Sequence, residues 1–500
     1  MRTHHLASWA AALAVLAVGA LPWQGGAQTE NLLPEADTLM NHVRRLASAQ
    51  CEGRLAGAEG YWRAAGYATQ ALARYGVQPY QGDWQQLFET ECNEVTGATL
   101  FTYDKPGDER TVYVLGRDFC CAGMTGRGYA NAEVVFCGYG IDAASFDEYA
   151  GVDAQGKIVL CLSGAPSWLP SDVTRAYLTA RDKARAARRH GACALVMVNA
   201  GPDAPANEVQ ARPYSGMGPH LPTFPMLQPT LACARALLQG ERMTLDSAMT
   251  QLESSMAPVS FHLRKRMELK VDTRYQPAAL TGNIVGIYPG TDERLKNEYV
   301  VVGAQLDHAG MQGKTCLFPG ADRDGSGVAV LLETARLLQQ AEEQPGRSVI
   351  FVLFGGGEQR HMGSQIFVSN FTPLRRIEAF VGIEGLGQAD SVAALGDYAY
   401  PSLWQVAHAM DSAYTRMLCR PAKRNPAGDA LAFHTIGIPS LTLAPPSGNA
   451  SRSHTPSDIA ENIDRHALAR AAKLAFETVY ELSFGNYQGR SAASRKYRFQ

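Results

Sequence analysis

The sequence predicts an α/β fold from about residue 270 onward, with a mostly parallel sheet that is covered by helices on both faces. Five short apolar runs rich in β-branched residues have the composition of buried strands: NIVGIYPG, YVVVGAQLD, RSVIFVLFGGG, IEAFVGIEG and IPSLTLAPP. Helical segments alternate with these runs, as expected for a parallel sheet with two covered faces. The apolar face of the first such helix comprises Val328, Leu331, Leu332, Ala335 and Leu338.

Two further regions are predicted before residue 266. Residues 28–94 are expected to be helical, because Leu39, Val43 and Leu46 recur at helical spacing and the pattern resumes in YWRAAGYATQALARYG. Residues 95–265 predict short strands between turns, at AEVVFCGYGI, GKIVLCLSG and ACALVMVNAG. The basic helix ARDKARAARRHG precedes the third of these strands and is interpreted as a solvated face that covers a sheet. The α/β region is assigned to residues 266–485 and a basic tail to residues 486–500.

The first 27 residues predict export. Arg2 precedes an apolar run from Leu6 to Leu21, and small residues follow at Gly25 and Ala27, which is typical of a signal peptide cleaved after Ala27. The run is shorter than the roughly 20 apolar residues that a membrane-spanning helix needs. We therefore expect no membrane span after cleavage, and a location in the periplasm or outside the cell.

Composition excludes one class of partner and leaves the thiol chemistry open. The formal net charge is -2, so nothing indicates a nucleic-acid partner. Ten cysteines in an exported chain permit disulfides, but they form no CxxC pair. Bridges between Cys51 and Cys92 or between Cys120 and Cys137 are possible, and several buried free thiols are an equal alternative.

Polar residues follow several of the predicted strands directly. In open parallel sheets, functional side chains gather just past the carboxyl ends of the strands. The positions that meet this condition are Gln305 to His308, Gly357 with Glu358, Glu384, and the stretch leading to His454.

Five segments in order resemble a known family. They are VVGAQLDHAG (301–310), PGADRDGSGVAVLLETARLL (319–338), RSVIFVLFGGGEQRHMGS (347–364), IEAFVGIEGLG (377–387) and GDALAFHTIGIPSLTLAPPSGNASRSHTPSD (428–458). Together they resemble the co-catalytic zinc aminopeptidases of metallopeptidase family 28, which are relatives of glutamate carboxypeptidase. The GRLAGAEG stretch and residues 95–265, which are similar to a protease-associated domain inserted in that family, extend the resemblance over nearly the whole chain.

The resemblance implies a two-zinc hydrolase and defines what its centre requires. One carboxylate bridges two zinc ions, each ion has further histidine or acidic ligands, and a glutamate takes a proton from the metal-bound water. Every ligand must offer a lone pair. Arginine cannot serve, because its guanidinium has only donors and stays protonated.

Three of the family's functional positions are lost in this chain. Gln305 stands where the family has a histidine ligand, two residues before the supporting Asp307. Arg323 stands at the bridging aspartate, three residues before Ser326. Gly357 stands at the general base, next to a ligand position six residues before Ser364.

The other positions are retained. The resemblance implies that the remaining ligands are Glu358, Glu384 and His454, so neither metal site keeps the three protein ligands that a catalytic zinc normally needs. Zinc is the cofactor expected from the family, and we expect it to be absent or weakly bound here. The residues assigned supporting positions are Asp307, Asp322, Asp324 and His308.

The arginine suggests how the fold tolerates these losses. Glu358 and Glu384 would be like charges in a partly desolvated pocket, which is costly without metal. At about 4 Å and an effective dielectric near 20, one contact with a guanidinium provides roughly 4 kcal/mol of Coulomb attraction before desolvation is subtracted. We therefore hypothesise that Arg323 is an internal counter-ion that bridges Glu358 and Glu384.

Two functions of different classes follow from these residues. The first is a catalytically degenerate pseudopeptidase that binds a peptide or protein. The second is an active exopeptidase with a rearranged one-zinc site, built from His308, Asp322 or Asp324, Glu358 and His454. A nucleotide-binding enzyme is a weaker third alternative, because GADRDGSG lacks the Lys-Ser/Thr end of a phosphate loop.

Overall fold

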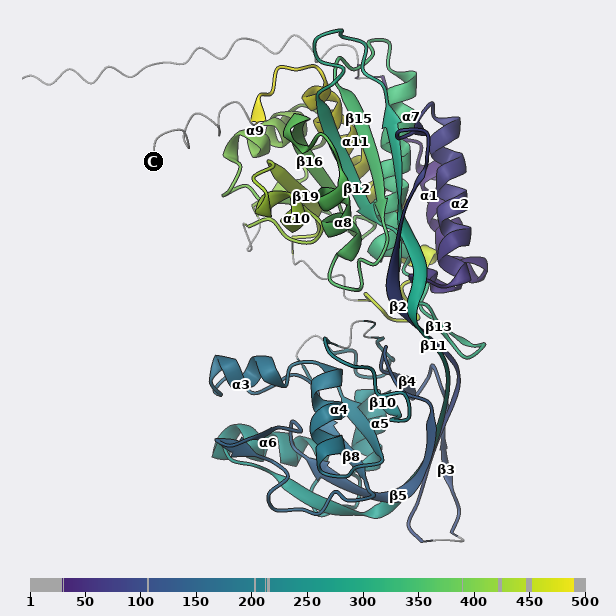
Figure 1. Cartoon of the computed structure of the whole chain (residues 1–500), viewed down its shortest axis with the longest axis vertical. Coiled ribbons are helices and arrows are strands. Elements are labelled where there is room, and N and C mark those ends of the chain that lie inside the picture. Colours follow the sequence, from purple (N-terminus) through teal and green to yellow (C-terminus); the bar gives the residue numbers. More distant parts are fainter. Residues whose placement is uncertain are drawn as a thin grey trace, which may run out of the picture.

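The computed structural model describes residues 29, 31–105, 108–201, 204–211, 213, 216–388, 390–420, 425–446 and 452–489. Figure 1 shows two parts joined by long strands, which we call the α/β domain (residues 31–94 and 266–489) and the insert (residues 95–265). The expected signal peptide and residues 490–500 of the expected basic tail lie outside the described residues. No helix within the described ranges is both long and apolar enough to cross a membrane.

The centre of the α/β domain is a mostly parallel sheet, which confirms the predicted fold class. Its parallel strands are β12 (Tyr299–Gln305), β15 (Ser348–Phe354), β16 (Ile377–Ile383) and β19 (Ser440–Ala444). β12 lies between β15 and β16, and β19 pairs with the far side of β16. At the edge, β17 (Val392–Leu395) is antiparallel to β19 and parallel to β18 (Leu418–Cys419). The apolar runs identified in the sequence are these strands.

Helices cover both faces of the sheet (Figure 1). Alternating side chains of the strands pack against these helices. On one face, Val300, Val302 and Phe351 join a core with the first helices and the last one. The helices of this face are α1 (Ala36–Leu46), α2 (Glu59–Arg74), α7 (Gly327–Gln340), α9 (Pro401–Met410) and α11 (Arg465–Ser483). On the other face, Val301 and Val352 pack with α8 (Met362–Asn370) and α10 (Ala430–Thr435).

The insert has its own sheet and its own apolar core. Its strands are β4 (Phe119–Cys121), β5 (Gly128–Cys137), β8 (Ile158–Leu162), β9 (Ala194–Val198) and β10 (Met226–Pro229). β5, β8, β9 and β10 are parallel neighbours, and β4 closes the edge in the antiparallel direction. Its helices are α3 (Ser171–Ala176), α4 (Ala180–Arg189), α5 (Leu231–Leu237) and α6 (Leu245–Ser255).

Two long strands join the parts into one hydrogen-bonded sheet. β2 (Gln85–Tyr103) and β11 (Ser260–Tyr288) are antiparallel to each other, and β11 pairs with β15 at one end and with β5 at the other. The expected boundaries at residues 95 and 265 therefore fall inside continuous strands. The N-terminal region contains the expected helices α1 and α2, and it also contains the first half of β2.

The remaining elements are short. They are η1 (Ala49–Arg54), β1 (Gln78–Pro79), β3 (Thr111–Tyr113), β6 (Asp142–Ala143), β7 (Phe146–Asp147), β13 (Met311–Gln312), β14 (Cys316–Leu317), η2 (Ala321–Ser326), η3 (Leu374–Arg376), η4 (Asp411–Thr415) and η5 (Ala460–Asn462). All ten cysteines lie in described residues, and all are free thiols in this structure, eight of them buried. The alternative of buried free thiols is thus the one observed.

Candidate metal centre

Parallel strand ends bring the sequence-selected residues together at one edge of the sheet. β12 ends at Gln305, and Glu384 directly follows β16. The loop after β15 carries Glu358, and the loop between β19 and α11 carries His454. Because β12, β15 and β16 are mutually parallel, their carboxyl ends share this edge.

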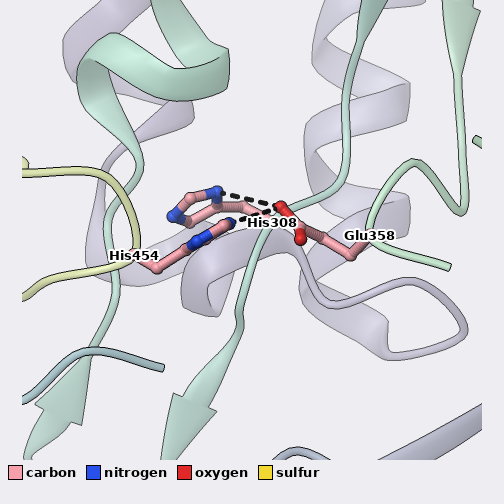
Figure 2. A group of neighbouring side chains, drawn as sticks. All are labelled: His308, Glu358 and His454. Atoms are coloured by element: carbon pink, nitrogen blue, oxygen red, sulfur yellow. Dashed lines mark hydrogen bonds and ion pairs between the residues drawn. The ribbon is translucent and has the colours of Figure 1, made fainter. Parts of the chain in front are cut away.

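Glu358 is the centre of a group of three side chains (Figure 2). Its Oε1 lies 2.7 Å from Nε2 of His454 and 3.7 Å from Nδ1 of His308. Burial alone would raise the pKa of Glu358, but attraction to His454 outweighs it and lowers that pKa to about 2. Glu358 is therefore a carboxylate. The same attraction outweighs burial at His454 and raises the pKa of its imidazole.

His308 is fully buried and faces this group. Its ring stacks on that of His454, with centroids 4.9 Å apart. Gly320 has a left-handed backbone (φ 58°), and a Cβ there would overlap the His308 ring, so glycine allows the close approach. Within the described residues, neither ring nitrogen has a hydrogen-bond partner. Burial lowers the pKa of His308 well below its usual range, so the ring is neutral.

Asp324 also lies near Nδ1 of His308. Its Oδ2 is 3.7 Å from His308 Nδ1, the side chain is 3% exposed, and both carboxylate oxygens are without a hydrogen-bond partner among the described residues. Burial raises the pKa of Asp324 to about 6, against the attraction of Arg323. Asp322, the other expected supporting acid, is structural instead: its Oδ1 accepts hydrogen bonds from the backbone N–H of Gly387 at 2.7 Å and from Ser326 Oγ at 3.1 Å.

Arg323 projects from η2 toward the end of β16. Its Nη2 lies 3.2 Å from Oε2 of Glu384, and its Nε lies 3.8 Å from Oδ1 of Asp324. Burial alone would lower the pKa of the guanidinium, but the attraction of Glu384, Asp324 and Glu358 outweighs it and raises that pKa. The charge of Arg323 also favours the ionised form of Glu358. Arg323 thus pairs directly with Glu384, whereas the shortest contact of Glu358 is with His454.

Gln305 and Gly357 fit each other. The Gln305 side chain lies where a Cβ at position 357 would be, so no larger residue fits there while Gln305 keeps this position. Gln305 Nε2 donates a hydrogen bond to Glu358 Oε1 at 3.2 Å. Asp307 supports the same loop, because its carboxylate accepts the backbone N–H groups of Gly357 at 2.8 Å and of Glu358 at 3.2 Å.

The structure adds two supporting residues that the sequence did not single out. Asp458, in the HTPSD stretch, accepts the backbone N–H groups of Asp322 and Arg323 and so holds the start of η2. Arg54 is fully buried and donates to four backbone carbonyls, including those of Leu306 and Gly320. A buried arginine within GRLAGAEG is a signal that sequence analysis could have used, because an unpaired arginine is rarely buried.

The insert also reaches this edge of the sheet. The backbone N–H of Ala211 donates to the His454 carbonyl at 2.8 Å, and Gln210 Nε2 donates to the Ser453 carbonyl at 3.1 Å. Glu208 accepts hydrogen bonds from the backbone and side chain of Ser457. Residues 208–211 of the insert therefore hold the loop that carries His454.

The side chains present do not fit a two-zinc centre. Arg323 places a positive charge beside Glu384, where a bridging carboxylate would be required, and Gln305 offers only an amide. Lone pairs for a single ion are available in one group: ligand atoms of His308, Glu358 and His454 all lie within 4.8 Å of one another. The donor set thus fits one metal ion and not a bridged pair.

The structure is that of an α/β protein whose polar side chains gather at the ends of parallel strands. Residues 283–479 match peptidase family M28 and residues 128–227 match the PA domain. The α/β domain is thus similar to peptidase family M28 and the insert to the PA domain, as the sequence resemblance predicted.

Individual relatives are similar at modest identity. Leucine aminopeptidase 1 of Paracoccidioides brasiliensis (strain Pb03) is 27% identical over 258 residues, which are 48% of this chain and 64% of that protein. The chain thus spans about 64% of the length of this relative. Among solved structures, an aminopeptidase from Aneurinibacillus sp. strain AM-1 (TM-score 0.61, 21% identity, 90% of this chain and 94% of that one) shares the fold. So does a zinc aminopeptidase from Bacillus subtilis (TM-score 0.62, 20% identity, 91% and 96%).

The Arg323–Glu384 pair should be coupled energetically. Removing one partner of a buried pair costs about 3–5 kcal/mol, and the 23% exposure of Arg323 reduces our expectation for Arg323→Ala to about 2 kcal/mol of unfolding free energy. Glu384→Gln should rescue much of this loss, because it removes the unpaired charge. Urea unfolding of the two single variants and the double variant measures the coupling.

The control for this cycle is Arg274→Ala, which removes an exposed pair with Glu94 and should change stability much less. Strictly additive effects of Arg323→Ala and Glu384→Gln would show that the two charges do not stabilise each other.

Proposed function

We propose that this protein is an exported, catalytically degenerate member of peptidase family M28 that binds a peptide or protein. The observation that carries the proposal is the ion pair between Arg323 and Glu384 at 3.2 Å, because the sequence resemblance assigns the bridging carboxylate to position 323. Two zinc ions cannot share a guanidinium, because it has no lone pair to offer.

The proton-transfer part of the reaction is missing as well. Peptide hydrolysis by a metal-bound water needs a group that accepts the proton of that water. The base position is Gly357, and the Gln305 amide occupies the space beside it. Gln305 does not titrate, so it cannot replace a glutamate as base.

A cavity beside the site supports peptide binding. It has a volume of about 420 Å³ and is lined by His361 and Ser364 from one side and by Leu431, Ala432 and Ile436 from the other. Asp429 follows Gly428, another residue that lines the cavity, and its Oδ1 lies 3.4 Å from Nδ1 of His361. This carboxylate raises the pKa of His361 to about 9 against the effect of burial. The cavity thus combines apolar walls with a charged rim, which suits an apolar side chain of a peptide.

The second candidate is an active exopeptidase with a rearranged zinc site. The observation in its favour is the group of His308, Glu358 and His454, which offers three ligand atoms, the number found in catalytic zinc sites. The family match and the aminopeptidase relatives are equally consistent with this candidate. It additionally requires a base to replace Gly357, and for that reason we favour the binding protein.

The activity assay separates the two candidates. We expect the purified protein, supplied with zinc, to hydrolyse leucyl arylamides no faster than its Glu358→Gln variant, because it has neither a bridged metal pair nor a base at position 357. Release of the arylamine is measured with and without a chelator, and an active zinc aminopeptidase verifies the assay. Chelator-sensitive hydrolysis that Glu358→Gln abolishes would establish the second candidate.

Peptide binding should depend on the cavity beside the site. Leu431 is 52% exposed at this cavity, and Leu431→Asp should weaken binding of a short peptide with an apolar amino-terminal residue at least about fivefold, because it places a charge on an apolar wall. Isothermal titration calorimetry gives the dissociation constants. The matched control is Leu280→Asp on β11, where the leucine is equally exposed and does not line this cavity. Equal affinities of the two variants would place the peptide elsewhere.

Restoring the three lost positions together should rebuild a two-metal centre. We expect the triple variant Gln305→His, Arg323→Asp and Gly357→Glu to bind one more zinc ion per chain than the parent, because it regains a ligand and the bridge. Zinc content after dialysis is measured by mass spectrometry. Gly357→Glu alone should instead lower the unfolding free energy by about 1–3 kcal/mol, because the new side chain overlaps Gln305.

An unchanged zinc content in a folded triple variant would contradict the assignment of these three positions. A Gly357→Glu variant as stable as the parent would show that Gln305 moves aside freely.

A further inference from the structure

We propose that His308, Glu358 and His454 bind a single divalent transition-metal ion, with the Asp324 carboxylate close to His308. This is not the ligand set that the resemblance implies, since His308 and Asp324 are supporting positions there and Arg323 occupies the bridge. The inference goes beyond the proposed function, because a metal ion can be bound here whether or not the protein hydrolyses peptides.

The ligand atoms are spaced for one ion. Zinc binds imidazole nitrogen at about 2.0–2.1 Å and carboxylate oxygen at about 2.0–2.2 Å, so neighbouring ligands of a tetrahedral site lie roughly 3.3–3.5 Å apart. Here Glu358 Oε1 lies 2.7 Å from His454 Nε2 and 3.7 Å from His308 Nδ1 (Figure 2). Shifts below 1 Å bring the three atoms to coordination distance of a common point.

Buried atoms without a hydrogen bond point to a ligand at this place. His308 is 0% exposed and Asp324 is 3% exposed, and within the described residues neither has a hydrogen-bond partner for its side-chain nitrogen or oxygen atoms. Nearly all buried polar groups in proteins have a hydrogen-bond partner, so these two groups, 3.7 Å apart, require an explanation. A metal ion bound by His308 beside the Asp324 carboxylate supplies it.

Local charge favours one ion over two. Two acids, Glu358 and Asp324, lie beside the imidazoles of His308 and His454, and as carboxylates they would balance the charge of one divalent ion. The negative charge of Glu384, the third acid that the resemblance places near the metal ions, is already balanced by Arg323 at 3.2 Å. A second cation near Glu384 would be repelled by the guanidinium, so we expect one ion per chain.

The ligand types select the kind of metal. Two imidazoles with carboxylates suit Zn²⁺ and Co²⁺, whereas Mg²⁺ and Ca²⁺ prefer sites made of oxygen atoms. Neighbouring groups fix the orientation of Glu358, as is usual around metal ligands. Gln305 Nε2 donates a hydrogen bond to Glu358 Oε1, and the Asp307 carboxylate accepts the backbone N–H of Glu358.

The ion would also connect the two parts of the chain. His454 lies on the loop that residues 208–211 of the insert hold, whereas His308 and Glu358 follow strands of the α/β domain. A bound ion therefore links the loop that contacts the PA domain to the edge of the central sheet, and it should stabilise this contact.

Zinc binding by the full chain, without its signal peptide, tests the proposal. After chelator treatment and dialysis against micromolar Zn²⁺, we expect about one zinc ion per chain by mass spectrometry and a higher melting temperature than the metal-free protein. Co²⁺ in place of Zn²⁺ should give the visible absorption bands of a low-symmetry, four-coordinate site. His308→Ala should weaken zinc binding at least about tenfold, in the range measured for perturbed zinc sites. The control is His408→Ala, an exposed histidine on α9, which should bind zinc like the parent.

Each outcome decides one question. No bound zinc in the folded parent, or unchanged affinity in His308→Ala, overturns the metal site. If His308→Ala does not fold, zinc affinity is measured for His308→Gln instead, and an unchanged affinity or the absence of the Co²⁺ bands in the parent overturns the metal site. Arylamide hydrolysis by the same preparation is scored separately: zinc without hydrolysis supports both proposals, and zinc-dependent hydrolysis overturns only the proposed function.

Discussion

The partly buried ion pair between Arg323 and Glu384 is the interaction on which the organisation of this site depends. Several carboxylates converge where the parallel strands end, and they cannot all be ionised in a desolvated space without cations. In a two-zinc hydrolase, metal ions provide that charge. Here a side chain of the protein provides part of it, at 3.2 Å from Glu384, and is built in when the chain folds. The charge balance around Glu384 is thus independent of metal supply.

Gln305 and Gly357 fit each other and the carboxylate of Glu358. The Gln305 side chain fills the space beside Gly357 and donates a hydrogen bond to Glu358. A glutamate at position 357 would therefore overlap the Gln305 side chain. An aspartate at position 323 would replace the arginine that pairs with Glu384 by another acid. These four residues thus form two matched pairs, Gln305 with Gly357 and Arg323 with Glu384.

The sequence predicted the fold and much of the site for physical reasons that are easy to identify. Strands buried on both faces are short apolar runs, so β12, β15, β16 and β19 were recognisable, and parallel strand ends meet at one edge. β2 and β11 were divided at residues 95 and 265, because half of each strand belongs to a different core and their side-chain patterns differ. His308 was assigned a supporting position in the two-zinc pattern and a ligand position only in the alternative one-zinc site, since its approach to Glu358 and His454 depends on tertiary packing over Gly320. The contact between Ala211 and His454 could not be predicted, because no local pattern encodes contacts between distant loops.

The position of His454 gives the insert a direct influence on the site. Its carbonyl accepts a hydrogen bond from Ala211 of the insert, and its imidazole contacts Glu358 at the end of the sheet. A shift of the insert that moved residues 208–211 would move this imidazole, and a ligand that fixes the imidazole would in turn favour the present placement of the insert. Binding at the sheet edge and the contact with the PA domain are therefore linked in both directions, since any free-energy coupling between two sites is reciprocal. That linkage requires no catalysis, so an occupied site could change the surface of the insert whether or not the protein hydrolyses peptides.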